Sequence, residues 1–152
     1  MQDKADVNVL PPIIPLVGLA LGILAAVLFP MKLLPSGVAV TVGLVIIAAS
    51  IFLALSAARE MRCAETAFDV RKPTSAIVAT GPFAFSRNPV YLSMMLLCVG
   101  AAFLANSLWM LLLVLPIGTV LCLAVIKPEE RYLEGKFGEP YRAYRARVRR
   151  WI

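Results

Sequence analysis

Two short polar stretches contain the residue types that could bind a small polar ligand. Ser86-Arg87-Asn88-Pro89 follows a Gly-Pro turn and precedes a long apolar run, whereas Pro128-Glu129-Glu130 directly follows another one. A helix start offers free N–H groups and partial positive charge, and an arginine offers a planar set of donors for an anion. The paired glutamates add negative charge. Together the two stretches suit a zwitterionic, positively charged small molecule.

Each stretch also has a purely structural interpretation. Ser86 or Asn88 can cap a helix that begins at Pro89, and the neighbouring arginine can extend to lipid headgroups along the edge of a bilayer. The glutamate pair can complement the dipole of a helix that begins at Pro128. The two stretches become informative only if the fold brings them together.

The composition is that of a membrane protein. Of the 152 residues, 61% are hydrophobic and only 16% are charged, which is too apolar for a soluble domain of this length. The absence of histidine excludes a histidine-based triad and an imidazole metal site. Cys63, Cys98 and Cys122 have no spacing typical of zinc sites or of a disulfide framework, so we expect reduced, structural cysteines and no metal.

We expect an all-α integral membrane protein with about four transmembrane helices in a single domain, residues 1–152. Four stretches without charged residues alternate with polar or turn-forming ones, and each is long enough to cross most of the hydrocarbon core. The predicted spans are residues 12–30, 36–58, 89–105 and 108–126. The polar break Asn106-Ser107 predicts a tight hairpin between the last two spans.

The positions of the basic residues predict the topology. With four spans, 14 of the 15 lysines and arginines fall on the side that holds both termini and the 59–88 segment. Lys32 alone falls on the other side. Basic residues concentrate on the cytoplasmic side of membrane proteins, so both termini are expected in the cytoplasm. The hairpin of the last two spans then places Arg87 and the glutamate pair side by side at the cytoplasmic face.

The tail, residues 128–152, is expected to form cytoplasmic amphipathic helices. One helix is predicted to begin at Pro128, and Glu139-Pro140 is predicted to open another. Aromatic and apolar residues recur every three to four positions in this second helix: Tyr141, Tyr144, Val148 and Trp151. Such a face lies on a membrane surface or closes over a site. For the two tyrosines we favour the bilayer interface over stacking on a ligand.

Three motifs in order resemble the integral-membrane methyltransferases. They are Gly81-Pro82-Phe83-Ala84-Phe85-Ser86-Arg87-Asn88-Pro89-Val90-Tyr91, then Pro128-Glu129-Glu130-Arg131-Tyr132-Leu133, then Phe137-Gly138-Glu139-Pro140-Tyr141-Arg142-Ala143-Tyr144. This family includes isoprenylcysteine carboxyl methyltransferases, phospholipid N-methyltransferases and their bacterial relatives. The resemblance covers roughly residues 72–152, and the first two spans match only as spans.

The resemblance implies an S-adenosylmethionine-dependent enzyme without a Rossmann domain, and the sequence indeed has no G-x-G-x-x-G loop. By position it implies that cofactor-binding residues come from the loop, the start of the third span and the glutamate pair. These are Ser75, Ala76, Ile77, Val78, Gly81, Phe83, Asn88, Pro89, Val90, Tyr91, Glu129 and Glu130. Arg87 and Glu130 are the candidates for positioning the substrate.

One residue departs from the family pattern. Asn88 stands where the isoprenylcysteine and phospholipid enzymes commonly have histidine, and an amide cannot titrate near neutral pH. An amine acceptor would therefore need a glutamate, a tyrosine or water to remove its proton, whereas a carboxylate acceptor needs no base.

The expected acceptor is lipophilic: an isoprenylcysteine-like carboxylate, a phospholipid amine or a small lipid. It would be methylated at the cytoplasmic face of a bacterial inner membrane, among membrane lipids and with no nucleic-acid partner. Two alternatives remain open at this point. One is a nicotinamide-dependent membrane reductase with a similar C-terminal layout, and the other is a non-catalytic small membrane protein or transporter.

Overall fold

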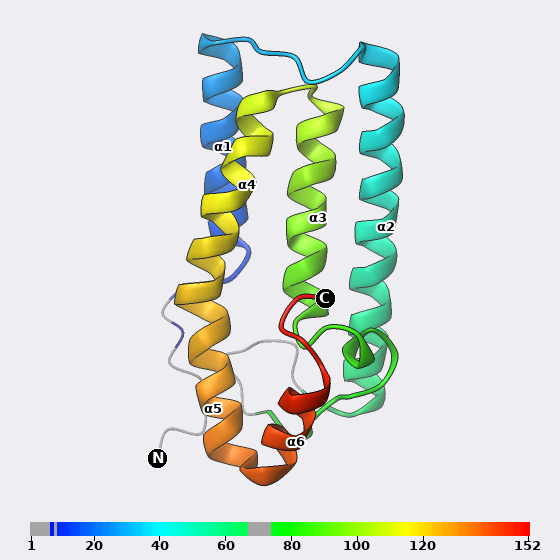
Figure 1. Cartoon of the computed structure of the whole chain (residues 1–152), viewed down its shortest axis with the longest axis vertical. Helices are drawn as coiled ribbons and strands as arrows, with labels where there is room; N and C mark the ends of the chain where they lie inside the picture. Colours follow the sequence, from blue (N-terminus) through cyan, green and yellow to red (C-terminus); the bar gives the residue numbers. More distant parts are fainter. Residues whose placement is uncertain (1–6, 8, 67–73) are drawn as a thin grey trace.

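The computed structural model describes residue 7 and residues 9–66 and 74–152. Within these ranges every regular element is a helix and no strand is found, which confirms the predicted all-α class. Figure 1 shows long helices standing side by side, and the pairs in contact give the order α2, α3, α4, α1. Their bounds are α1 Ile13–Leu28, α2 Ser36–Cys63, α3 Pro89–Leu104 and α4 Leu108–Leu121.

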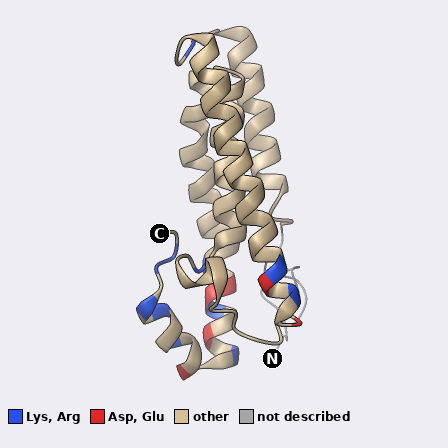
Figure 2. Cartoon of the chain, turned by 90° about the vertical axis from the view of Figure 1, so that its right-hand side faces the viewer, with Lys and Arg blue, Asp and Glu red and all other residues tan. Residues whose placement is uncertain are grey.

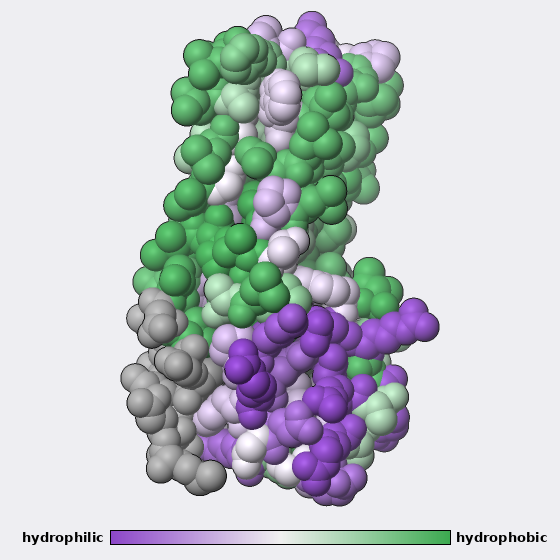
Figure 3. Space-filling model, turned by 60° about the vertical axis from the view of Figure 1, so that its left-hand side comes forward, coloured by the Kyte–Doolittle hydropathy of each residue, from purple (hydrophilic) through white to green (hydrophobic). Residues whose placement is uncertain are grey.

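The outer faces of these helices are apolar. Leu24, Phe52 and Leu115 are 55%, 74% and 74% exposed, and most of the upper part of the surface in Figure 3 is hydrophobic. Two continuous helical stretches, Ser36–Cys63 and Leu108–Phe137, are long and apolar enough to cross a bilayer. Only 17% and 28% of their most apolar windows are buried, unlike the core helices of soluble proteins. The shorter apolar helices are α1 and α3.

The fourth long helix does not end where the sequence predicted. After α4 come a π-helical turn, Cys122–Ile126, and α5, Lys127–Phe137, with helical backbone at both junctions. Pro128 therefore lies inside a continuous helix and does not begin a new one, so the predicted helix start there was wrong. Proline lacks an N–H and clashes with the carbonyl four residues earlier, and the wider π turn just before it relieves both problems.

The predicted hairpin between α3 and α4 is present, and it also holds the connection between α1 and α2. Ser107 caps α4 by accepting a hydrogen bond from the Met110 N–H at 3.3 Å. Asn106 has a left-handed backbone, with φ of 47°. Its Oδ1 accepts from the N–H groups of Leu33 (2.9 Å) and Leu34 (3.1 Å), and its Nδ2 donates to the Leu34 carbonyl at 2.8 Å. This side chain holds the connector that crosses the end of the bundle, together with hydrogen bonds from the Leu108 N–H to the Met31 carbonyl and from Trp109 Nε1 to the Phe29 carbonyl.

Close contact between α2 and α3 depends on glycine. A Cβ added at Gly43 would lie 2.7 Å from the Leu104 nitrogen and 2.9 Å from the Gly100 carbonyl oxygen. The two backbones therefore approach more closely than any side chain would allow, as is common for helices packed in membranes. This contact holds the N-terminal part of α2 against the C-terminal end of α3.

The C-terminal part folds back beneath the bundle. Gly138, with φ of 60°, joins α5 to α6, Glu139–Arg147, and the chain then returns toward the start of α3 (Figure 1). The predicted amphipathic helix at Glu139-Pro140 is therefore present. It ends before Val148 and Trp151, so these two residues do not share its face as predicted.

We expect Asn106→Ala to lower the free energy of unfolding by about 1–3 kcal/mol, because it leaves two backbone N–H groups and one carbonyl without their partner. Thermal melting in detergent micelles measures this loss. Asn106→Asp keeps the two accepted hydrogen bonds and should melt closer to the wild type. Equal melting temperatures for all three proteins would contradict the role assigned to this side chain.

Candidate functional site

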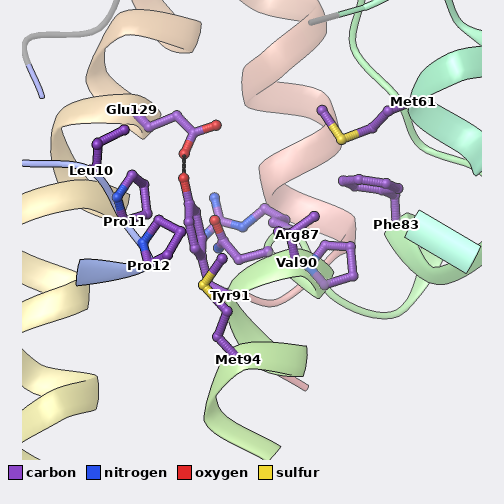
Figure 4. A pocket seen from close by; sticks show the side chains of 12 residues that line it. Leu10, Pro11, Pro12, Met61, Phe83, Arg87, Val90, Tyr91, Met94 and Glu129 are labelled. Atoms are coloured by element: carbon purple, nitrogen blue, oxygen red, sulfur yellow. Dashed lines mark hydrogen bonds between the residues drawn. The ribbon is translucent and has the colours of Figure 1, made fainter. Parts of the chain in front are cut away.

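A cavity of about 200 Å³ lies at the charged end of the bundle (Figure 4). We call it the apolar chamber because most of its walls are apolar. They come from the residues before α1, the end of α2, the short 3-10 helix Gly81–Ala84 and the start of α3. The lining residues are Leu10, Pro11, Pro12, Met61, Phe83, Arg87, Asn88, Pro89, Val90, Tyr91, Met94 and Glu129.

A second, smaller cavity of about 80 Å³ adjoins it. We call it the tyrosine chamber because Tyr141 and Tyr144 of α6 form part of its wall. The loop that precedes the 3-10 helix contributes Thr74, Ala76, Ile77 and Val78, and Thr66 and Leu133 complete the lining. Five residues line both chambers and are called the shared wall: Met61, Phe83, Arg87, Asn88 and Glu129.

The chain around Arg87 is held by backbone contacts. Phe83 is fixed because its carbonyl accepts a hydrogen bond from Tyr144 Oη at 2.7 Å. Ser86 Oγ accepts from the Asn88 N–H at 3.1 Å, just before α3 begins. Asn88 is the N-cap residue of α3, but no side chain caps this helix, because Asn88 Nδ2 donates instead to the Arg150 carbonyl at 3.0 Å. The predicted helix start at Pro89, with Asn88 at the N-cap position, is therefore confirmed, but the predicted capping by a side chain is not.

Arg87 and the glutamate pair meet, as the hairpin argument predicted. Arg87 Nη2 lies 3.1 Å from Glu130 Oε1, and the two side chains are 8% and 11% exposed. Arg87 Nε and Nη1 are buried and have no hydrogen-bond partner in the described part of the chain. An unsatisfied buried donor is costly, so these two nitrogens indicate a position for an acceptor from outside the chain.

Glu129 lies on the other side of the shared wall. Its Oε2 accepts a hydrogen bond from Tyr91 Oη at 2.8 Å (Figure 4). Burial raises the pKa of the Glu129 carboxyl from 4.5 to about 7; the Tyr91 hydrogen bond lowers it and the charge of Glu130 adds to the rise. Among the described residues that line the two chambers, Glu129 is the only carboxyl group.

The two tyrosines of α6 are not at the bilayer interface that the sequence analysis favoured. Tyr141 and Tyr144 are 2% and 5% exposed, and burial raises the pKa of each phenol to about 12. Their rings lie 6.3 Å apart, centroid to centroid, and are tilted by 60°. The turn at Gly138 folds α6 back toward the 3-10 helix, which explains why the chain buries them.

The structure brings most of the predicted site residues to the two chambers. Those that line one or both are Ala76, Ile77, Val78, Phe83, Arg87, Asn88, Pro89, Val90, Tyr91 and Glu129. Ser75 points elsewhere, since its Oγ donates to the Glu65 carbonyl at 2.7 Å. Gly81 lines neither chamber, and its left-handed backbone packs against Glu60. Glu130 is also outside the lining and is held in ion pairs.

Sequence reasoning missed several lining residues. Met94 is an apolar position within a long helix, and nothing in its local pattern separates it from lipid-facing neighbours. Met61 lies between Glu60 and Arg62 in a charged stretch that gave no reason to single it out. Leu10, Pro11 and Pro12 enter the lining because the segment before α1 lies close to α3 and α5. Arg150 was also missed, although it binds both Glu130 oxygens. It belongs to a run of tail arginines that look alike in sequence.

The comparisons with known proteins agree with these motifs. Residues 38–140 match the family model described as phospholipid methyltransferase, and this range includes both α3 and the glutamate pair. An uncharacterized protein of Haemophilus influenzae is 39% identical over 70 residues, which cover 41% of this chain and all of that protein. The family match extends over more than half of the chain, so this chain belongs to the phospholipid methyltransferase family, whose members are membrane methyltransferases.

Proposed function

We propose that this chain transfers a methyl group from S-adenosylmethionine to a lipophilic acceptor at the cytoplasmic face of a bacterial inner membrane. The observation that carries the proposal is the pair of adjoining chambers with a shared wall. Two reactants of unlike polarity can enter from different sides and meet beside the same residues. Holding two reactants in the right geometry can lower the activation barrier of a direct displacement by about 7–11 kcal/mol.

The tyrosine chamber is the proposed cofactor site, and at about 80 Å³ it has to widen to take up the whole cofactor, since small-molecule sites usually measure roughly 300–1,000 Å³. S-adenosylmethionine supplies an activated methyl group on a positively charged sulfonium, and it also carries a zwitterionic amino-acid part. The shared wall offers one carboxyl, Glu129, and the unsatisfied N–H groups of Arg87. These residues match the charges of such a molecule, and Tyr141 and Tyr144 provide aromatic surface beside them.

The apolar chamber is the proposed acceptor site. Its walls of proline, leucine, valine and methionine suit the tail of a membrane lipid or another apolar molecule. Met61 and Phe83 stand between this chamber and the other one, where they keep water from the reacting groups. An acceptor that dissolves in the bilayer can then approach from the side of the bundle.

Proton removal depends on the class of acceptor. A carboxylate acceptor needs no base, and an amine acceptor must lose a proton that Asn88 is unable to take. Glu129 is suited to take up that proton, because its pKa of about 7 matches neutral conditions and it lines both chambers. The site is therefore equipped for an amine as well as for a carboxylate.

The proposed topology has four spans with both termini in the cytoplasm. In Figure 2 the charged residues of the described chain gather at one end, and a short blue stretch marks the opposite end, in the connector between α1 and α2 that contains Lys32. Lys4, Arg71 and Lys72, which also entered the charge count, lie outside the described residues.

Labelling of Lys32→Cys in intact cells by a membrane-impermeant maleimide tests this orientation, with exposed Cys63 as the native control that should stay unlabelled.

We expect the purified protein in detergent to bind S-adenosylmethionine and to show no heat of binding with NADPH. Glu129→Gln should weaken binding at least about tenfold, because the buried carboxylate opposite a cationic ligand is lost. Isothermal titration calorimetry measures both. The matched control is Glu139→Gln, which removes an exposed carboxylate outside both chambers. Absence of binding, or equal binding by the two variants, would sink the proposal.

Binding should also depend on pH through Glu129. Its pKa is raised to about 7, so the carboxylate is mostly charged at pH 8 and mostly protonated at pH 6. Affinity for the cationic cofactor should therefore fall by about tenfold from pH 8 to pH 6. In Glu129→Gln the affinity should change little over this range. A wild-type affinity that stays flat or rises toward pH 6 would contradict the assignment.

A further inference from the structure

The last residues of the chain form part of the structure around Arg87. After α6 the chain returns to the start of α3, where the Arg149 carbonyl accepts from the Arg87 N–H at 3.0 Å. The Arg150 carbonyl accepts from Ser86 Oγ at 3.3 Å and from Asn88 Nδ2 at 3.0 Å. Trp151 packs against the buried cluster that includes Leu121 and Val125. This segment is therefore fastened at the site by backbone and side-chain contacts.

Glu130 is shared between two arginines. Arg150 holds it with both ends of its guanidinium, Nε to Oε1 at 3.0 Å and Nη2 to Oε2 at 2.7 Å. Arg87 Nη2 reaches only Oε1, at 3.1 Å. The carboxylate thus faces Arg150 with both oxygens, and Arg87 approaches it from the side. This division explains why Arg87 keeps two buried nitrogens without a partner.

We propose that Arg150 is a positioning residue, which acts through Glu130 to keep Arg87 available for an anionic oxygen group of a ligand. Without Arg150 the Glu130 carboxylate is free to turn and pair with Arg87 through both oxygens, the geometry that arginine and carboxylate prefer. That pairing would occupy N–H groups of Arg87, a residue that lines both chambers. The inference rests on the proposed function, because it requires a ligand in these chambers.

The anionic group can come from either reactant. Arg87 lines both chambers, so it can meet the carboxylate of the cofactor or an acidic headgroup on the acceptor. The two sources share one chemistry, an anionic oxygen placed against a buried guanidinium. If the group belongs to the cofactor, changing Arg150 weakens cofactor binding; if it belongs to the acceptor, the change weakens acceptor binding. A matched pair of ligands for each source, with and without the anionic group, distinguishes the two cases.

The test compares Arg150→Gln with Arg149→Gln in the full-length protein in nanodiscs, by calorimetric titration. Arg149 is an exposed neighbour of the same charge, and its contact with Arg87 uses only its backbone. One ligand pair is S-adenosylmethionine and its decarboxylated form; the other is octyl phosphate and octanol. We expect Arg150→Gln to lose about tenfold in affinity for the member of one pair that carries the carboxylate or phosphate, and little for the counterpart that lacks it. Arg149→Gln should bind like the wild type.

Arg150→Lys is a second variant in case the first folds poorly, because lysine keeps the charge but cannot make the bidentate contact. Its affinity should lie between those of the wild type and Arg150→Gln. Equal affinities of Arg150→Gln and Arg149→Gln for all four ligands would overturn the inference while leaving the proposed function intact. An equal loss for both members of each pair would overturn it too, since a merely structural role does that. A wild type that binds none of the ligands would overturn both proposals.

Discussion

The Glu130 carboxylate joins three parts of the chain that are far apart in sequence. It sits on α5, it receives Arg87 from the start of α3, and it receives Arg150 from the C-terminal segment. Removing one partner from such a buried ion group leaves an uncompensated charge, which costs far more than the net value of the intact group. The arrangement of the site therefore depends on all three side chains being present together.

This arrangement solves a problem of the environment. In the middle of a bundle with apolar outer faces, charged side chains are costly unless they are paired. Most charged residues of the described chain instead lie at one end of the bundle, where α6 and the returning C-terminal segment cover the site. The chambers are consequently dry enough to raise the pKa of Glu129 to about 7, yet they border the apolar part of the bundle. The proposal that a polar cofactor and an apolar acceptor both contact the shared wall rests on this arrangement.

The sequence allowed the helices and the meeting of Arg87 with the glutamate pair to be predicted. Long uninterrupted apolar runs predict helices, and the two-residue break Asn106-Ser107 predicts a hairpin. The start of α3 and the end of α4 therefore had to be neighbours. The continuous helix through Pro128 was not predictable in the same way, because the π turn that accommodates it has no local signature. Nor was the contact of Arg150 with Glu130, because it depends on the tertiary packing of the C-terminal segment, in which Trp151 contacts the buried cluster.

The central claim is that cofactor and acceptor occupy adjoining chambers that meet at the shared wall. An experimental structure of the protein with bound S-adenosylhomocysteine, the product left after methyl transfer, tests it most directly. The account predicts the adenosyl group beside Tyr141 and Tyr144 and the sulfur at the wall formed with Asn88 and Glu129. A ligand seated in the apolar chamber, or away from both chambers, would contradict it.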